Sequence, residues 1–312
     1  MDQAYVFVLH ICCALLAMAV AALTVKLKRA TDENKEIVSQ NEYRDLSDDE
    51  RAVLCDIEQG LDNEEFKMHL QFIVDNKTKG IVSAEALSRW ERPNGETLFP
   101  AKYIGVMEKC GYITRLDYCM FEKACAKLEK WSNTLLGGLT LCCNFTRITI
   151  SDKDFVSKIK EIADRYTFDR RKLLIEITED SIEKNHSIAL ENILKVKEIG
   201  FRIALDDIGS GYTSLMNLCE YPIDVAKIDR DVLLMTGGER GEKLFLGIIS
   251  LAHYLNLKVV CEGVETDEQN DLVTASDCDY VQGWYYSRSH SEENAEAFAE
   301  EYMSRLEQSN GI

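Results

Sequence analysis

The chain has 312 residues, 46% of them hydrophobic, which is enough for one large domain with a hydrophobic core plus a small appendage. Its formal net charge of -18 argues against binding to a nucleic-acid duplex, because duplex binding relies on lysine and arginine to displace counterions. None of the eleven cysteines forms a C-x-x-C pair with partner histidines at zinc spacing, so reduced cytosolic thiols are favoured over a disulfide framework.

Residues 4–25 form an apolar run that is interrupted only by His10 and Thr24. As a helix the run would be about 33 Å long, enough to cross the ~30 Å hydrocarbon layer of a bilayer. Three basic residues follow within positions 26–29 and none precedes the run, so the positive-inside rule places the rest of the chain in the cytoplasm. The alternative is a signal peptide cleaved near residues 19–21, which would need a basic start and a shorter run. We therefore predict a single-pass transmembrane anchor over residues 1–29, in the inner (cytoplasmic) membrane.

Residues 30–50 are highly charged and lead into D-D-E-R at 48–51. Leu54, Ile57 and Leu61 follow at helical spacing. This pattern predicts a charged, exposed linker over residues 30–50 that runs into a short helix. The folded domain is then expected over residues 51–305.

From about residue 66, apolar runs alternate with amphipathic stretches. Buried strands are predicted at 69–74, 81–86, 139–144, 173–177, 202–205, 225–228, 258–261 and 280–281. Helices are predicted between most of them, at 100–131, 154–166, 188–199, 242–255 and 268–275. Eight strands over roughly 240 residues favour an α/β fold of the (β/α)8 TIM-like barrel type over an open sheet. The first connection, K-T-K-G, is too short for a helical crossover, so the first strand is expected to run antiparallel to its neighbour.

Acidic or amide residues stand at the ends of several of these runs. They are Glu85, Asn144, Glu176, Asp206, Asp207, Asp229 and Glu262. Because the carboxyl ends of barrel strands meet at one rim, we expect these side chains to converge. Converging carboxylates repel unless a cation neutralises them, and hard oxygen donors suit Mg²⁺ or Mn²⁺ rather than zinc. Taken singly, each residue is more typical of a solvated charge, and Asp206-Asp207 before a glycine is typical of a turn.

The motifs around these residues occur in a fixed order. They are E-A-L-S-R-W at 85–90, N-F-T at 144–146, E-I-T-E at 176–179, D-D-I-G-S-G-Y-T-S-L at 206–215, K-I-D at 227–229, E-G-V-E at 262–265 and Q-G-W at 282–284. With this set, residues 51–300 resemble the EAL domain family, phosphodiesterases that hydrolyse the bacterial second messenger cyclic di-GMP. The resemblance implies a barrel with one reversed strand, in agreement with the short first connection.

The resemblance also implies two divalent cations, Mg²⁺ or Mn²⁺, at this rim. One cation would be held by Glu85, Asn144, Glu176 and Asp206. The second would be held by Asp206, Asp207 and Glu262, with Asp206 as the bridge. Two such ions can clamp a water between them and neutralise the charge that develops at the phosphate.

Further residues match positions that act on water or substrate in the family. Lys227 matches the lysine that orients or deprotonates the attacking water, and it is expected to act together with Glu262 and Asp207. Two neighbouring cations would lower the pKa of Lys227, because like charges disfavour its protonated form. Arg89, Gln282 and Asp229 match or adjoin substrate-binding positions. Arg89 next to Trp90 is also compatible with a simple packing pair.

The remaining matches concern loops. Glu179, Gly209, Gly211 and Glu265 are expected to position the loops around the site. The family's usual aromatic after the aspartate pair is replaced here by Ile208, a change that affects the loop and leaves the implied ligands unchanged. The family often dimerises beside the loop at 209–215, so a homodimer is a further expectation.

Two functions follow from the resemblance. The first is membrane-anchored, two-metal-dependent hydrolysis of cyclic di-GMP to the linear dinucleotide pGpG. The second is a non-catalytic cyclic di-GMP receptor or a protein-interaction module of the same fold. The chain keeps the implied metal ligands and the lysine, which favours the enzyme.

Overall fold

A computed structural model of the chain describes residues 47–178, 186–209, 218 and 220–309. By its internal contacts the chain divides into two units, Met1–Asp56 and Ile57–Ile312. The anchor predicted over residues 1–29 lies outside the described residues. Among the helices that are described, none combines the length and apolarity that a membrane span requires.

Helix α2 (Asp48–Asp62) starts inside the stretch that was expected to be a linker. Ser47 and Glu50 explain this start. The Ser47 Oγ accepts from the Glu50 backbone N at 3.2 Å, and the Glu50 carboxylate accepts from the Ser47 backbone N at 2.8 Å. This reciprocal capping box satisfies donors that a helix N-terminus otherwise leaves unpaired.

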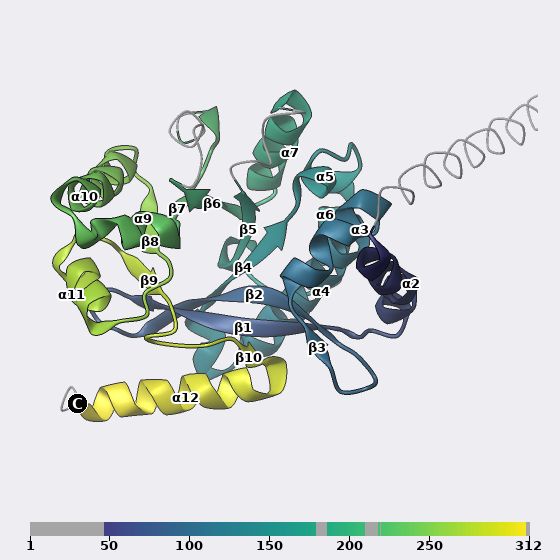
Figure 1. The fold of residues 1–312 in the computed structure, drawn as a ribbon, viewed down its shortest axis with the longest axis horizontal. Coiled ribbons are helices and arrows are strands. Elements are labelled where there is room, and N and C mark those ends of the chain that lie inside the picture. The colour runs from purple at the N-terminus through teal and green to yellow at the C-terminus, as the bar shows by residue number, and fades with distance from the viewer. Residues whose placement is uncertain (1–46, 179–185, 210–217, 219, 310–312) are drawn as a thin grey trace, which may run out of the picture. The chain divides into compact units, whose positions relative to one another are not determined.

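Eight strands within the described ranges close into a barrel (Figure 1). They are β1 (Phe66–Asp75), β2 (Ile81–Glu91), β4 (Thr140–Phe145), β5 (Leu173–Thr178), β6 (Arg202–Ile208), β7 (Val225–Ile228), β8 (Lys258–Cys261) and β9 (Tyr280–Gln282). Strand β1 pairs antiparallel with both β2 and β9, whereas β2 and β4 through β9 pair in parallel. The predicted barrel with one reversed strand is therefore confirmed.

The turn that reverses the first strand is fixed by Asp75. Its Oδ1 accepts from the backbone N of Lys77 at 3.0 Å and of Thr78 at 2.7 Å. Lys79 then takes a left-handed conformation with φ of 59°. Such Asx-type turns connect antiparallel strands over very few residues, which is why no helix fits here.

Helices cover the outside of the barrel. They are α3 (Ile104–Cys110), α4 (Ile113–Trp131), α5 (Arg147–Ile150), α6 (Phe155–Ala163), α7 (His186–Glu198), α9 (Arg230–Leu234), α10 (Glu239–Tyr254), α11 (Asp267–Ala275) and α12 (Glu292–Ser309), with 3-10 turns η2 (Pro100–Lys102), η3 (Leu135–Gly138), η4 (Arg170–Lys172) and η6 (Met235–Gly237). The helix predicted over 100–131 is divided, because Gly111 ends α3 in a left-handed conformation with φ of 75°.

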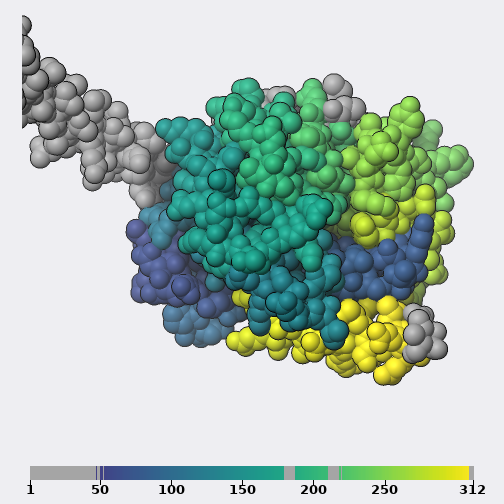
Figure 2. All heavy atoms as spheres, turned by 180° about the vertical axis from the view of Figure 1, so that it is seen from behind, coloured from purple at the N-terminus to yellow at the C-terminus, as the bar shows by residue number. Residues whose placement is uncertain are grey.

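The short helices α5 and α9 and the 3-10 turns η3, η4 and η6 were not predicted, and neither were β3, β10 and α12. Strands β3 (Thr97–Leu98) and β10 (His290–Ser291) are two-residue additions that pair with β2 and β1. Helix α12 packs on β1, where Phe298 stacks on Phe72 at 5.6 Å, and it runs along the lower edge in Figure 2.

One apolar layer fills the barrel interior. It consists of Ile73, Cys142, Leu174, Ala204, Val225 and Val260, which pack against one another. Every one of these side chains is at most 4% exposed. Since side chains in a strand alternate between two faces, the residue two positions further along each strand also faces inward. The identity of those residues determines what lies directly above the apolar layer.

Candidate active site

A polar layer follows the apolar one with an offset of two residues. Five residues of the apolar layer belong to parallel strands. Two positions after each of them the sequence has Asn144, Glu176, Asp206, Lys227 and Glu262, respectively. Glu85 joins them because Ser83, two residues before it, lies opposite the core residue Ile73 on the reversed strand. The alternation of the strands thus directs these side chains toward the barrel axis at the carboxyl ends of the parallel strands.

Lys227 lies at the centre of this layer and is 1% exposed. Its Nζ lies 2.5 Å from a carboxylate oxygen of Glu176 and 2.6 Å from one of Glu262. Asp206 follows at 3.3 Å and Glu85 at 3.4 Å. One ammonium group therefore contacts four carboxylates, three of them on strands β2, β5 and β6 and the fourth directly after β8.

Glu85 also binds two amides. Its Oε1 accepts from the Asn144 Nδ2 at 2.8 Å, and its Oε2 accepts from the Gln282 Nε2 at 2.7 Å. Gln282 is buried at the end of β9, and its own Oε1 lacks a hydrogen-bond partner. These contacts fix both oxygens of Glu85 and leave an acceptor of Gln282 available to a ligand.

The excess of negative charge shifts several pKa values. Burial, together with repulsion from the other carboxylates, raises the pKa of Glu176 well above its ordinary range, although Lys227 opposes the shift. Burial raises the pKa of Glu262 to about 8, again against Lys227. Burial by itself lowers the pKa of Lys227, but Asp206, Glu176, Glu262 and Glu85 outweigh it, and the pKa is raised well above its ordinary value. The expected lowering rested on two neighbouring cations, and the residues alone act in the opposite direction.

Asp207 reaches the site through an irregular stretch of β6. The pairing of β6 with β7 shifts register between Leu205 and Ile208, and Asp207 adopts a left-handed conformation with φ of 59°. In a regular strand, Asp206 and Asp207 would point to opposite faces, and such a bulge re-aims a side chain. Burial, with repulsion from Asp206 and Asp229, raises the pKa of Asp207 to about 6.

Asp229 also has a structural task. Its carboxylate accepts from the Asp231 backbone N at 2.7 Å and thereby caps helix α9. It shares a hydrogen bond with Asp207 as well. The structure thus links Asp229 to the carboxylate cluster through Asp207.

Arg89 follows Glu85 on the same face of β2 and is largely buried. Its guanidinium donates to the Ser88 carbonyl at 2.7 Å and to the Ser289 Oγ at 3.1 Å. It also lies over the ring of Phe99 at 4.9 Å, so it stacks on this residue and not on its neighbour Trp90. The side chain is held in one orientation by these three contacts.

The residues predicted to position loops are only partly described. Glu179 and Gly211 lie outside the described residues. Gly209 has φ of 99°, and a Cβ there would meet the Val232 side chain at 2.3 Å, so no other residue fits without a shift. Glu265 accepts from Arg230 at 2.9 Å and stands at the edge of a cavity of about 260 Å³ beside Glu85, Glu262 and Gln282.

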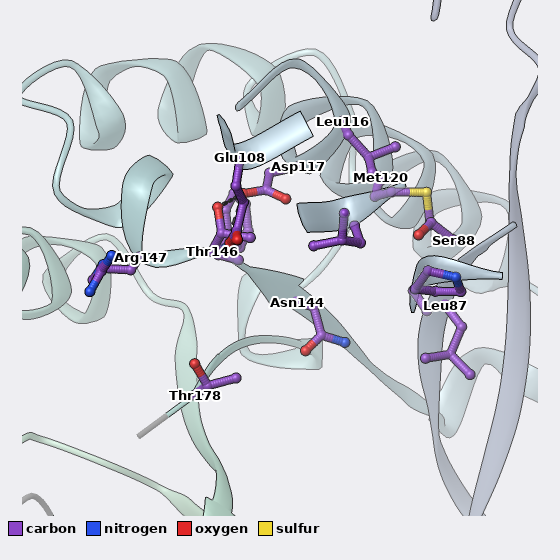
Figure 3. A pocket seen from close by; sticks show the side chains of 14 residues that line it. Leu87, Ser88, Glu108, Leu116, Asp117, Met120, Asn144, Thr146, Arg147 and Thr178 are labelled. Carbon is purple, nitrogen blue, oxygen red and sulfur yellow. Dashed lines mark hydrogen bonds between the residues drawn. The ribbon is translucent and has the colours of Figure 1, made fainter. Parts of the chain in front are cut away.

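A larger cavity, of about 540 Å³, has Asn144 in its wall. Figure 3 shows Asn144 between Leu87 and Thr178, with Glu108, Asp117 and Thr146 gathered above it. Apolar residues of β2, α3 and α4 line much of the remaining wall, among them Ile104 and Met120. The cavity therefore combines an apolar wall with carboxylate acceptors, next to the polar layer.

Comparison with known sequences identifies the fold family. The sequence pattern of the EAL domain matches residues 54–289. The chain belongs to the EAL domain family.

The relatives of this EAL domain differ in length. The signaling protein YkoW of Bacillus subtilis is 30% identical over 251 residues, which are 80% of this chain and 31% of YkoW. The cyclic di-GMP phosphodiesterase RocR of Pseudomonas aeruginosa is 28% identical over 273 residues, 87% of this chain and 68% of RocR. This chain thus spans about a third of YkoW and two thirds of RocR. Among solved structures, the complex of the PaMucR phosphodiesterase with c-di-GMP matches with a TM-score of 0.74 at 26% identity, over 78% of this chain and 99% of that one.

The donor set of the EAL site fits divalent cations in its chemistry. It consists of hard oxygen atoms in excess negative charge, and the buried Glu176 Oε2 lacks a hydrogen-bond partner. In the part of the chain that the structure describes, no three Asp, Glu, His or Cys side chains stand at the spacing of ligands to a common ion. The Lys227 ammonium lies between the carboxylates instead. The donor atoms and their negative charge therefore suit a divalent cation, while the Lys227 ammonium lies at the centre of the cluster.

Sequence reasoning missed one residue that shapes the site. Asp117 on α4 is 5% exposed, and one of its carboxylate oxygens accepts from the Thr146 backbone N, the Thr146 hydroxyl and the Thr149 hydroxyl at 3.0, 2.7 and 2.6 Å. These contacts fix the turn that follows Asn144 in N-F-T. An acidic residue on the apolar face of an amphipathic helix, one position after Leu116, was the available signal.

Proposed function

We propose that this chain hydrolyses cyclic di-GMP to the linear dinucleotide pGpG in a reaction that depends on two divalent cations. The observation that carries the proposal is the convergence of four carboxylates on Lys227 at the carboxyl ends of the barrel strands. Membership in the EAL family and the names of RocR and the PaMucR complex support the choice of substrate. A buried charge cluster of this kind has no evident purpose in stability, because burying uncompensated carboxylates costs free energy.

The cations are proposed to be Mg²⁺ or Mn²⁺. Glu85, Asn144, Glu176 and Asp206 would hold one of them, and Asp206, Asp207 and Glu262 the other. When bound, the ions would activate a water and neutralise charge on the phosphate. Asn144 contributes a neutral donor, which limits the negative charge that an anionic substrate has to approach.

The chain's own residues would orient the substrate and the water. Lys227, which lies at the axis of the barrel, would orient or deprotonate a water at the carboxylate layer. The Arg89 guanidinium, fixed by Ser88, Ser289 and Phe99, would face a phosphate. Gln282 offers its free Oε1 to the substrate or to water. The cavity beside Asn144 is suited to a nucleobase, because its apolar wall can stack on a ring and its carboxylates can accept N–H groups.

The location of the enzyme is also a proposal. The apolar run at residues 4–25 and the basic residues after it support a single-pass anchor in the inner membrane, with the barrel in the cytoplasm. Association into a homodimer beside the loop at 209–215 is proposed from the family resemblance. Size measurement of the detergent-solubilised full-length chain would test the dimer, and membrane fractionation would test the anchor.

Hydrolysis itself is tested with the purified full-length chain, cyclic di-GMP and either Mg²⁺ or Mn²⁺. We expect pGpG to form, and we expect Glu85→Ala and Lys227→Ala to abolish its formation. Glu239→Ala, which removes one side of an exposed ion pair on α10, is the matched control and should retain activity. Binding of cyclic di-GMP without turnover in the unmodified chain would instead establish a receptor.

A further inference from the structure

The contacts of Lys227 differ from those that its proposed role in hydrolysis requires. A residue that acts on water needs one contact toward the water, whereas the Nζ of Lys227 lies within 3.4 Å of four carboxylates. All four belong to the set that is proposed to hold the cations. The ammonium therefore occupies the position in which a positive charge is most needed.

The electrostatics explain why this arrangement is favourable. Glu176 is fully buried, and the side chains of Glu85, Asp206 and Glu262 are 9, 14 and 19% exposed. Carboxylates brought together in such a setting repel one another, and water screens them poorly. One buried ammonium compensates part of that charge. Without it, the polar layer would depend on cations from solution.

From these contacts we infer that Lys227 is the internal counter-ion of the metal-free site, and that divalent cations load the site by displacing its ammonium from Glu176 and Glu262. The inference rests on the metal binding that is part of the proposed function. It makes Lys227 a positioning residue for the carboxylates, in addition to any action on water. It also makes metal binding and the lysine contacts competing events.

The barrel leaves room for such a displacement. A cavity of about 110 Å³ lies against Lys227 inside the barrel, and Ser83, Cys142 and Tyr280 line it as well. Protein interiors seldom leave space of this size unfilled. Because Ile73, Leu174, Val225 and Val260 of the apolar layer also line this cavity, it gives space to the alkyl part of Lys227, while the displaced ammonium has to stay among the polar groups above that layer.

Lys127 offers a matched control elsewhere in the fold. It is 5% exposed, and its Nζ contacts Glu292 at 3.0 Å and Glu296 at 3.3 Å. Both partners lie on α12, outside the carboxylate layer. Its carboxylate partners are 37 and 30% exposed, so removal of this lysine disturbs an ion pair with a buried cation and partly solvated anions, at a place where no cation is proposed to bind.

The test compares full-length wild-type chain with Lys227→Met, Lys227→Arg and Lys127→Met. Thermal unfolding is followed by circular dichroism in EDTA and in MnCl₂, and Mn²⁺ binding is measured by titration calorimetry. In EDTA, Lys227→Met and Lys127→Met should both melt below the wild type. Mn²⁺ should raise the melting temperature of Lys227→Met more than that of the wild type, whereas Lys127→Met should show the wild-type increase.

The decisive measurement is the Mn²⁺ affinity of each variant relative to that of the wild type. Because the ammonium no longer competes, Lys227→Met should bind Mn²⁺ about 5- to 150-fold more tightly than the wild type, the usual range for coupled sites. Lys227→Arg keeps the charge and should stay close to the wild type. If Lys227→Met folds only when Mn²⁺ is present, that rescue supports the inference equally.

Other results would overturn the inference. Equal Mn²⁺ affinity in the wild type and Lys227→Met would refute the counter-ion role while leaving the metal site intact. The same holds if Lys227→Met fails to fold even with Mn²⁺. Absence of Mn²⁺ binding in every variant, including the wild type, would refute the metal site of the proposed function and the counter-ion role with it.

Discussion

Lys127 and Lys227 are almost equally buried, at 5% and 1% exposure, yet the charges around them differ. Lys127 and its neighbour Lys130 face Glu292 and Glu296, so positive and negative charges balance. Lys227 faces four carboxylates, and the negative charge is in excess. The cluster around Lys127 joins α4 to α12, and its charges neutralise one another within the chain. The cluster around Lys227 keeps an excess of negative charge, as is typical of a binding site.

The comparison is tested most strongly by catalysis. Lys227→Met should lower the rate of cyclic di-GMP hydrolysis by about 10²- to 10⁴-fold, the usual contribution of a group that acts on the proton of the attacking water. Lys127→Met should leave kcat per folded molecule unchanged, because its contacts lie outside the carboxylate layer. The measurement is the initial rate of pGpG formation at saturating Mn²⁺. An equal loss of rate in both variants would erase the distinction between the two lysines.

When Mn²⁺ is present, Lys127→Met should lower the stability of the chain more than Lys227→Met does. Lys127→Met removes the buried cation of an ion pair whose carboxylates are 37 and 30% exposed, and it should lower the free energy of unfolding by about 1–3 kcal/mol, whatever the Mn²⁺ concentration. Urea unfolding followed by circular dichroism measures this value. A loss below 1 kcal/mol would mean that solvent screens Glu292 and Glu296 more than their contacts suggest.

Asp117 extends the comparison to a buried carboxylate with no cation in contact. Burial is the main cause that raises its pKa from the ordinary value of 3.8 to about 6, even though Thr149 and Thr146 donate to it. Because the folded pKa lies above the unfolded one, protonation favours the folded state. This contribution is complete below about pH 4 and is lost as the pH rises through 6, which amounts to up to about 3 kcal/mol.

The free energy of unfolding of the wild type should therefore fall between pH 4 and 7 relative to that of Asp117→Asn. Urea titrations of both proteins at several pH values measure the difference. Parallel pH profiles would show that the pKa of Asp117 is close to its ordinary value in the folded chain.

The smallest effect concerns single carboxylates in the two clusters. Glu296→Gln should destabilise the chain by about 1–3 kcal/mol, because Lys127, Lys130 and Trp131 all donate to its carboxylate. Glu176→Gln in EDTA should be neutral or stabilising, because it relieves repulsion while Lys227 keeps three other carboxylates. Thermal unfolding in EDTA compares the two variants. Equal destabilisation would show that the charge around Lys227 is already balanced.

The strands and the end at which the polar residues gather could be predicted from sequence. Buried parallel strands are apolar on both faces, so their limits are visible, and the residue after each run is then at the rim. The length of the K-T-K-G turn was sufficient to predict the reversed strand. Each of these conclusions depends on local pattern and on chain geometry.

Other features depend on contacts between distant segments. The central position of Lys227 follows from four strands that meet at the barrel axis, and no local pattern reports it. The bulge at Asp207 breaks the alternation on which strand prediction relies. Helix α12 was missed because its apolar residues become meaningful only against β1, as the stacking of Phe298 on Phe72 shows.

The two-residue offset between core and polar layers has a consequence for how such barrels change over time. A deletion of one residue between Leu174 and Glu176 would exchange the inward and outward sides of β5 from that point on, so an aliphatic group would replace the carboxylate at the axis. Length variation is thus tolerated in the segments that join strands and helices, and it is prohibited within the strands themselves. A relative that lost this parity in even one strand would keep its barrel and lose its chemistry.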